Sequence, residues 1–156
     1  MAGTACGGMD QTISIMGKSG TAMKIDFVPD TKCTDVKIPD SVALVIKNSA
    51  TPSPKLLTLG TRYNKRVVEC RFAVSAMSLK AGESTDFLKC PFATFEELQK
   101  QKKLSFSEML DLAKSAFKSE DAYSLEMIQK EFGVEDPFKL VSDVPHINKV
   151  KEQNII

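Results

Sequence analysis

A carboxylate that follows two glycines, with one methionine between them, is the arrangement in this chain best suited to chemistry. Residues 7–11 are Gly-Gly-Met-Asp-Gln, and an amphipathic run at 13–16 follows them. Because glycine has no Cβ, Gly7 and Gly8 allow the backbone to turn sharply and to approach a ligand closely. If a helix begins here, its free N–H groups form an anion-tolerant end that holds Asp10. A carboxylate in that place can orient a hydroxyl and accept its proton, or it can cap the helix.

The same stretch resembles a signature motif of the galactokinase branch of the GHMP superfamily of sugar and small-metabolite kinases. At residues 6–17 the motif is Cys-Gly-Gly-Met-Asp-Gln-Thr-Ile-Ser-Ile-Met-Gly. The resemblance continues in matching order through residues 20–27, 42–49, 63–70 and 104–110. The last of these is similar to a helical insertion of N-acetylgalactosamine kinases and fungal-type galactokinases. Several motifs in one order are far more specific than one alone, so the sequence resembles a partial, internal segment of this family.

The resemblance implies a role for four residues. Asp10 matches the catalytic aspartate, which faces the anomeric hydroxyl of a galactose-type sugar, and Gly7 matches a position whose backbone approaches that sugar. Tyr63 matches an aromatic residue whose hydroxyl can hydrogen-bond a ring substituent. Lys55 matches a loop residue that contacts nucleotide, although Pro54 replaces an asparagine of the pattern and removes a backbone donor. Without the resemblance, Tyr63 is only an aromatic residue at a helix start and Lys55 a solvated surface lysine.

Other family motifs have no counterpart in the 156 residues. The first is an N-terminal segment, which supplies an arginine, the sequence Gly-Glu-His and an acidic contact to the sugar. The second is the Gly-Leu-Ser-Ser-Ser loop around the ATP phosphates. The third is a glycine-rich C-terminal segment. The resemblance implies ATP and Mg²⁺ as co-substrates. We expect this chain to hold neither firmly and to be inactive alone as a kinase. Residues 148–156 resemble no element of the family.

Two other functions stay open at this stage. Fungal galactose sensors share the fold and bind galactose and ATP in order to engage a regulatory protein, and residues 63–69 resemble the fungal type. A truncated isoform without any function is the other alternative. Galactose and N-acetylgalactosamine also stay open as the sugar.

The composition is that of a soluble globular protein, with 42% hydrophobic and 26% charged residues and a net charge of +1. Neither a nucleic acid nor a membrane partner is expected, and no signal peptide precedes the motif, so the cytoplasm is the expected compartment. The four cysteines form no Cys-x-x-Cys pair and there is one histidine, so we expect buried free thiols and no metal site.

The elements that must position Asp10 follow from periodicity. Apolar residues within 8–17 fit a helix or a strand, and the resemblance favours a helix that Gly17 ends. Alternation over 21–28 and again at Val36 and Ile38 predicts half-buried strands. The apolar run 42–46 suits an inner strand. In all, four strands and two helices are expected in the first half. The edges of this sheet would lack neighbouring strands to pair with.

The later residues predict mainly helices. Residues 50–61 contain two prolines and predict an exposed loop, 62–79 a long helix and 80–91 a turn-rich connector. Ser105 and Glu108 form a capping box, a second helix runs from Ser124 to Gly133, and a third short one follows Asp136. We therefore expect an α+β fragment of a GHMP kinase fold. Residues 1–80 would be the latter part of the N-terminal catalytic domain, with a helix and mainly antiparallel strands. Residues 81–156 would be a helical insertion and the start of the C-terminal domain, with an irregular tail.

Overall fold

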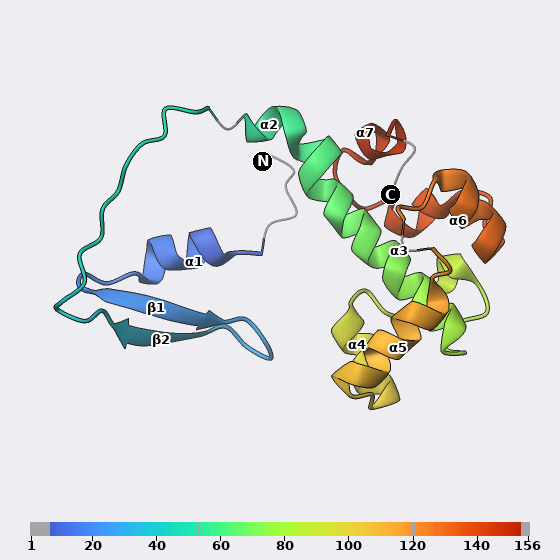
Figure 1. Ribbon diagram of the computed structural model, residues 1–156, viewed down its shortest axis with the longest axis horizontal. Helices are drawn as coiled ribbons and strands as arrows, with labels where there is room; N and C mark the ends of the chain where they lie inside the picture. Colours follow the sequence, from blue (N-terminus) through green and yellow to red (C-terminus); the bar gives the residue numbers. More distant parts are fainter. Residues whose placement is uncertain (1–6, 53, 120, 154–156) are drawn as a thin grey trace. The chain divides into compact units, whose positions relative to one another are not determined.

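The computed structural model describes residues 7–52, 54–119 and 121–153, which combine helices with a two-stranded antiparallel sheet (Figure 1). The chain divides into two compact units, Cys6–Ser53 and Pro54–Ile156, each described here by itself. This arrangement confirms the expected α+β class. The sequence also predicted a boundary near residue 80 between two domains of the GHMP kinase fold. That boundary stays a prediction.

The Cys6–Ser53 unit contains helix α1 (Met9–Met16) and a hairpin of strands β1 (Thr21–Asp26) and β2 (Lys32–Lys37). The register pairs Thr21 with Lys37 and Asp26 with Lys32. Alternate residues of β1, including Met23 and Ile25, are half-buried, as the alternation predicted. On β2 only Cys33 is half-buried and Val36 is 47% exposed, so the half-burial predicted for the strand around Val36 is wrong.

Gly17 ends α1, as predicted. Its N–H donates to the carbonyl of Ile13 at 2.9 Å and its ψ of 141° leaves the helical region. A Cβ at this position would lie 2.6 Å from the Ile13 carbonyl oxygen. Only glycine fits there without a backbone shift, because real Cβ atoms do not approach an oxygen so closely.

The strand predicted at 42–46 is wrong. These residues adopt no regular secondary structure, and the side chains of Leu44, Val45 and Ile46 are 74%, 91% and 97% exposed. No backbone group of residues 43–47 forms a hydrogen bond to another described residue. A β-strand exists only when a neighbour satisfies its backbone groups. In the described part of the chain the sheet consists of β1 and β2, rather than the four strands expected.

The Pro54–Ile156 unit is built around helix α3 (Asn64–Lys80), the long helix expected at 62–79 (Figure 1). A short helix α2 (Lys55–Thr58) and a π-helical turn η1 (Leu59–Tyr63) lead directly into it. The expected loop over 50–61 is therefore wrong from residue 55 onward. Leu59 is 4% exposed, and burial of such a side chain favours the helical path over an exposed loop.

Short helices follow α3. They are η2 (Phe87–Lys89), α4 (Phe95–Lys102), α5 (Phe106–Ala116), α6 (Leu125–Phe132), η3 (Pro137–Val141) and α7 (Ile147–Lys151). Each of them except α7 begins at a residue whose side chain accepts a capping hydrogen bond. The capping box of Ser105 and Glu108 opens α5 as predicted, and Gly133 ends α6 in the left-handed conformation at φ 63°. A second capping box, Thr94 with Glu97, opens α4. Helix α4 was not predicted, although this box has the same spacing as the first.

The main core lies where α3 meets the chain beyond it. Its buried residues include Val68, Phe72, Phe87, Phe138 and Val141. The ring of Phe72 lies 5.6 Å, centroid to centroid, from the rings of both Phe87 and Phe138. Aromatic rings at this separation add attraction to the area that they bury.

A second, smaller cluster of Met77, Leu98 and Ala116 joins α3 to α4 and α5. Val150 in α7 is 1% exposed and belongs to the main core. The irregular tail expected at 148–156 is therefore helical up to Lys151.

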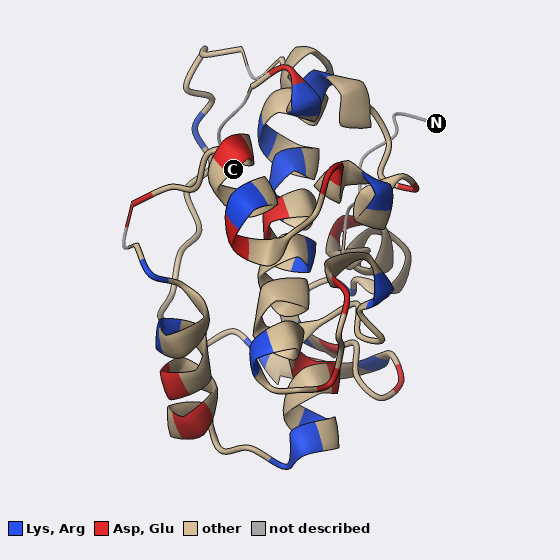
Figure 2. Cartoon of the chain, turned by 90° about the vertical axis from the view of Figure 1, so that its right-hand side faces the viewer, with Lys and Arg blue, Asp and Glu red and all other residues tan. Residues whose placement is uncertain are grey.

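Acidic and basic side chains are interspersed along the helices of this unit (Figure 2). Arg71 of α3 contacts Asp143 at 2.6 Å, and Lys102 contacts Glu83 at 3.0 Å. The hydrogen bond from Arg71 lowers the pKa of Asp143 below its ordinary value. No helix among the described residues is long and apolar enough to cross a bilayer.

Candidate functional site

The glycine pair sets the start of helix α1. Gly8 is the N-cap residue, with φ 81° and ψ −5°, and its carbonyl accepts a hydrogen bond from the N–H of Thr12 at 2.9 Å. A left-handed conformation favours glycine, because other residues bring Cβ close to the backbone. The first turn of α1 lies close to the end of β1, since a Cβ on Gly8 would be 3.8 Å from the Phe27 ring.

Asp10 lies in the first turn of α1 and is exposed. It does not cap the helix, because Gly8 holds the cap position and no side chain there accepts a capping hydrogen bond. The alternative role considered for Asp10 is therefore wrong. A carboxylate in the first turn is still favoured by the free N–H groups and the helix dipole. The main-chain carbonyl of Asp10 accepts a bond from Ser14 Oγ at 2.7 Å, within the helix.

Gly7 and Asp10 are brought together at this exposed helix start. Gly7 is itself exposed, and a Cβ built on it would meet no atom within 4 Å. Packing within the described chain therefore does not require glycine at position 7, whereas the backbone conformation requires it at position 8. A substrate hydroxyl can reach the carboxylate of Asp10 from solvent.

Tyr63 and Lys55 belong to the Pro54–Ile156 unit. Tyr63 is the last residue of η1 and is 48% exposed, so its ring is available to a ligand. Lys55 is the first residue of α2, directly after Pro54, which has a φ of −76°. The sequence-predicted residues therefore fall into two pairs, Gly7 with Asp10 and Tyr63 with Lys55, one pair in each unit.

The described residues contain no group of three or more His, Cys, Asp and Glu side chains that could hold a metal ion. Three free thiols are described: Cys33 and Cys90 are half-buried and Cys70 is exposed. The expectation of buried thiols is wrong for these three, because Cys70 lies on the solvent side of α3 and the other two are only partly covered. Cys6 lies outside the described residues.

An apolar cavity in the Pro54–Ile156 unit was not predicted. It is lined by residues from 69 to 132 that belong to five separate stretches of the chain. Hydrophobic periodicity can assign apolar residues of a single helix to a core face, but it does not indicate that side chains from separate stretches leave space between them.

Replacing Gly8 by alanine is expected to destabilise the start of α1 by about 1–2 kcal/mol, because alanine is strained at φ 81°. Hydrogen exchange of the Thr12 amide, which is bonded to the Gly8 carbonyl, measures this opening directly. The matched control is Gly7→Ala, which has open space around its Cβ and should leave the exchange rate unchanged. Equal acceleration by the two substitutions would contradict the assignment of the N-cap.

The sequence is similar to those of several galactokinases. The chain is 33% identical over 126 residues to a galactokinase of Dictyostelium discoideum, and the match covers 81% of this chain and 24% of that relative. It is 32% identical over 111 residues to a galactokinase of Saccharomyces cerevisiae, and the match covers 59% of this chain and 21% of that relative. It is 40% identical over 75 residues to a galactokinase of Candida parapsilosis, and the match covers 47% of this chain and 15% of that relative. The chain thus spans a quarter or less of each of these relatives. No protein-family model matches it.

Proposed function

Most of this chain is a partial segment of the galactokinase family, and on that premise we propose that it serves the ATP-dependent phosphorylation of a galactose-type sugar. The relatives that support this are galactokinases from an amoeba and from fungi. The observation that carries the proposal is the exposed carboxylate of Asp10 in the first turn of α1, directly after the glycine N-cap. Galactose and N-acetylgalactosamine are both candidates for the sugar.

In the proposed reaction, Asp10 orients the anomeric hydroxyl and accepts its proton. The anomeric oxygen forms a bond to the γ-phosphorus of ATP while the bond from that phosphorus to the β–γ bridging oxygen breaks, and ADP leaves. Phosphoryl transfer requires mainly positioning and charge stabilisation from the protein. Because Asp10 is exposed, closure of the site over the sugar would strengthen its interaction with the hydroxyl.

The remaining roles follow from the same premise. The backbone at Gly7 would approach the sugar, and the hydroxyl of Tyr63 would hydrogen-bond one of its ring substituents. Lys55 would contact the nucleotide, with Pro54 weakening that contact by removing a donor. Mg²⁺ would arrive with ATP as part of the co-substrate, and the cytoplasm is the proposed compartment.

We further propose that the 156-residue chain does not phosphorylate sugar by itself and holds neither ATP nor Mg²⁺ firmly. Its sequence has no Gly-Leu-Ser-Ser-Ser loop to wrap the phosphates. A helix N-terminus with a serine-rich loop supplies several N–H donors to a phosphate, and a single lysine does not replace them. Sugar-dependent turnover of ATP by the purified chain would overturn this part of the proposal.

A second candidate is a regulatory protein that binds galactose and ATP and engages a partner protein. Only the sequence resemblance of residues 63–69 to the fungal type supports this candidate. The two candidates share a sugar site but differ in turnover, so sugar binding alone does not distinguish them.

Thermal unfolding of the purified chain with galactose tests the sugar site that both candidates require. A ligand that binds only the native state stabilises it, so galactose at several times its Kd should raise the Tm by about 2–4 °C. Glucose, which differs at one hydroxyl, should do less. Asp10→Asn should abolish the rise, whereas Asp40→Asn, a carboxylate whose side chain is 92% exposed in the same unit, should keep it. A melting curve that galactose leaves unchanged would reject the sugar site in this chain.

A further inference from the structure

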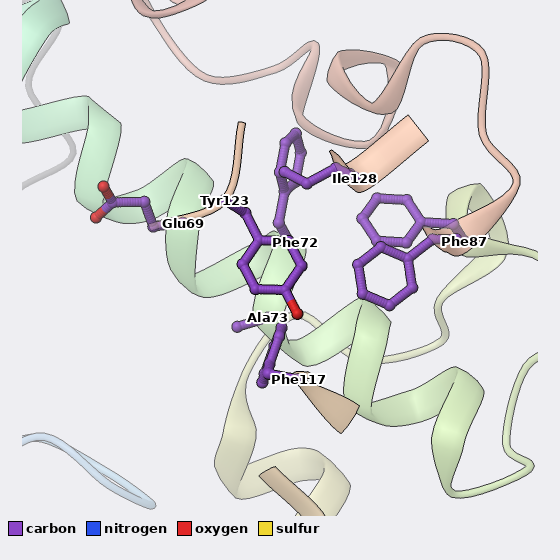
Figure 3. A pocket seen from close by; sticks show the side chains of 8 residues that line it. Glu69, Phe72, Ala73, Phe87, Phe117, Tyr123 and Ile128 are labelled. Atoms are coloured by element: carbon purple, nitrogen blue, oxygen red, sulfur yellow. The ribbon is translucent and has the colours of Figure 1, made fainter. Parts of the chain in front are cut away.

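The Pro54–Ile156 unit contains a cavity of about 160 Å³ (Figure 3). It lies between α3, η2, the end of α5 and α6. Its walls are formed by eight side chains, most of them aromatic: Glu69, Phe72, Ala73, Phe87, Phe117, Tyr123, Ile128 and Phe132. This cavity is separate from the residues assigned to sugar and nucleotide, and its role does not depend on the proposed kinase function.

The aromatic walls hold one another in place. The rings of Phe117 and Tyr123 meet edge to face with centroids 5.8 Å apart, and those of Phe87 and Phe132 stack at 5.4 Å. Phe87 and Tyr123 are 2% and 8% exposed. Rings that are buried and packed against each other cannot easily rotate to fill the space between them. The cavity is therefore already formed without a ligand.

The polar groups near the cavity have partners elsewhere. The carboxylate of Glu69 is paired with the guanidinium of Arg66 at 2.6 Å, and in Figure 3 it points away from the rings. The hydroxyl oxygen of Tyr123 accepts the N–H of Lys118 at 2.8 Å. Among the described residues, no cationic side chain lines the cavity. A phosphate or carboxylate placed inside would lose its hydration without gaining a counter-charge, which strongly disfavours an anion.

We propose that this cavity is a binding site for a small uncharged aromatic molecule of one ring. The cavity is partly open to solvent, and its volume is close to the roughly 150 Å³ of an enclosed apolar protein cavity that binds benzene. Rings in the walls offer edge-to-face and stacked contacts to a further ring, which a saturated sugar cannot use in the same way. Size excludes a nucleotide, and the apolar lining disfavours a sugar, whose hydroxyl groups would lose hydrogen bonds.

Nuclear magnetic resonance of isoleucine methyl groups in the full chain, titrated with benzene, tests the site. The methyl signals of Ile128, which is 4% exposed and lines the cavity, should shift saturably, because an aromatic ring displaces the signals of nearby protons. The signals of Ile15 and Ile46, which are 80% and 97% exposed, should stay in place. No saturable shift at Ile128, or equal shifts at all three, would overturn the proposal.

Two controls define the ligand class and the location. Benzoate has the same ring with a negative charge and should leave Ile128 unshifted, so a benzoate shift as large as that of benzene would overturn the restriction to uncharged ligands. Ala73→Leu places a larger side chain in the cavity and should weaken benzene binding at least about tenfold, because two groups cannot share one packed volume. Cys70→Leu adds a leucine at an exposed position of the same helix and should bind benzene like the wild type. Unchanged binding by Ala73→Leu would place the ligand elsewhere.

Discussion

Replacing Phe72 by alanine is expected to lower the free energy of unfolding of the Pro54–Ile156 unit by about 3–5 kcal/mol. Phe72 is 4% exposed and its ring contacts the rings of Phe87 and Phe138 at 5.6 Å. The substitution removes buried apolar area and leaves a void that the neighbouring rings cannot fill. Urea denaturation followed by circular dichroism measures the loss, because the signal is dominated by the helices of this unit.

The control for Phe72 is Phe106→Ala. Phe106 is the first residue of α5, but its side chain is 84% exposed, so the same chemical change there should alter the free energy of unfolding by about 0.5 kcal/mol or less. Similar losses at the two positions would show that the core described around α3 is not the stabilising one.

Gly60→Ala is expected to destabilise the contact between η1 and α7 by about 1–3 kcal/mol, since overpacking forces neighbouring atoms to move. A Cβ on Gly60 would lie 2.7 Å from Cβ of Lys149 and 3.3 Å from Cβ of His146. Because a Cβ atom is fixed to the backbone, α7 must shift as a whole. The amide of Lys149, which donates to the carbonyl of His146 at 3.0 Å, should then exchange with solvent faster.

Gly7→Ala is the matched control for Gly60, because it is the same substitution with open space around the new methyl group. It should leave the exchange of Lys149 unaffected. If Gly60→Ala also has no effect on that amide, α7 does not pack on η1 in solution.

Local signals explain the elements that were predicted correctly. Helix α5 begins at a capping box and α6 ends at a glycine in the left-handed conformation, and both features are set by residues within a few positions of each other. Helix α3 is long enough for its pattern to be recognised without any knowledge of its partners.

The elements that were missed depend on contacts far along the chain. The loop predicted over 50–61 was wrong from residue 55 onward, because the two prolines before it signal a turn. In the structure Leu59 and Gly60 are buried, and the space at Gly60 is closed by Lys149 and His146. Residues 42–46 have the composition of a buried strand, but composition does not supply a neighbouring strand. In both cases the decisive atoms are distant in the sequence.

The candidate site was predictable to different degrees. The glycine pair and Asp10 are adjacent in sequence, so the motif indicated where they lie, and the structure added that Gly8, not Asp10, holds the cap. The contributions proposed for Tyr63 and Lys55 stay predictions. The aromatic cavity depends on five separate stretches, and the space between side chains has no signature in any one of them.

The uncovered apolar run 42–46 has a consequence for the lifetime of this protein in a cell. Proteases and chaperones recognise exposed, uncharged segments of chain whose backbone groups are not hydrogen-bonded within the protein. In a cell, proteins that expose such segments are continuously degraded or retained by chaperones. Here such a segment is present in the folded state, so recognition does not have to wait for global unfolding. We therefore expect limited proteolysis of the folded protein to begin within residues 42–46, before the helical core unfolds.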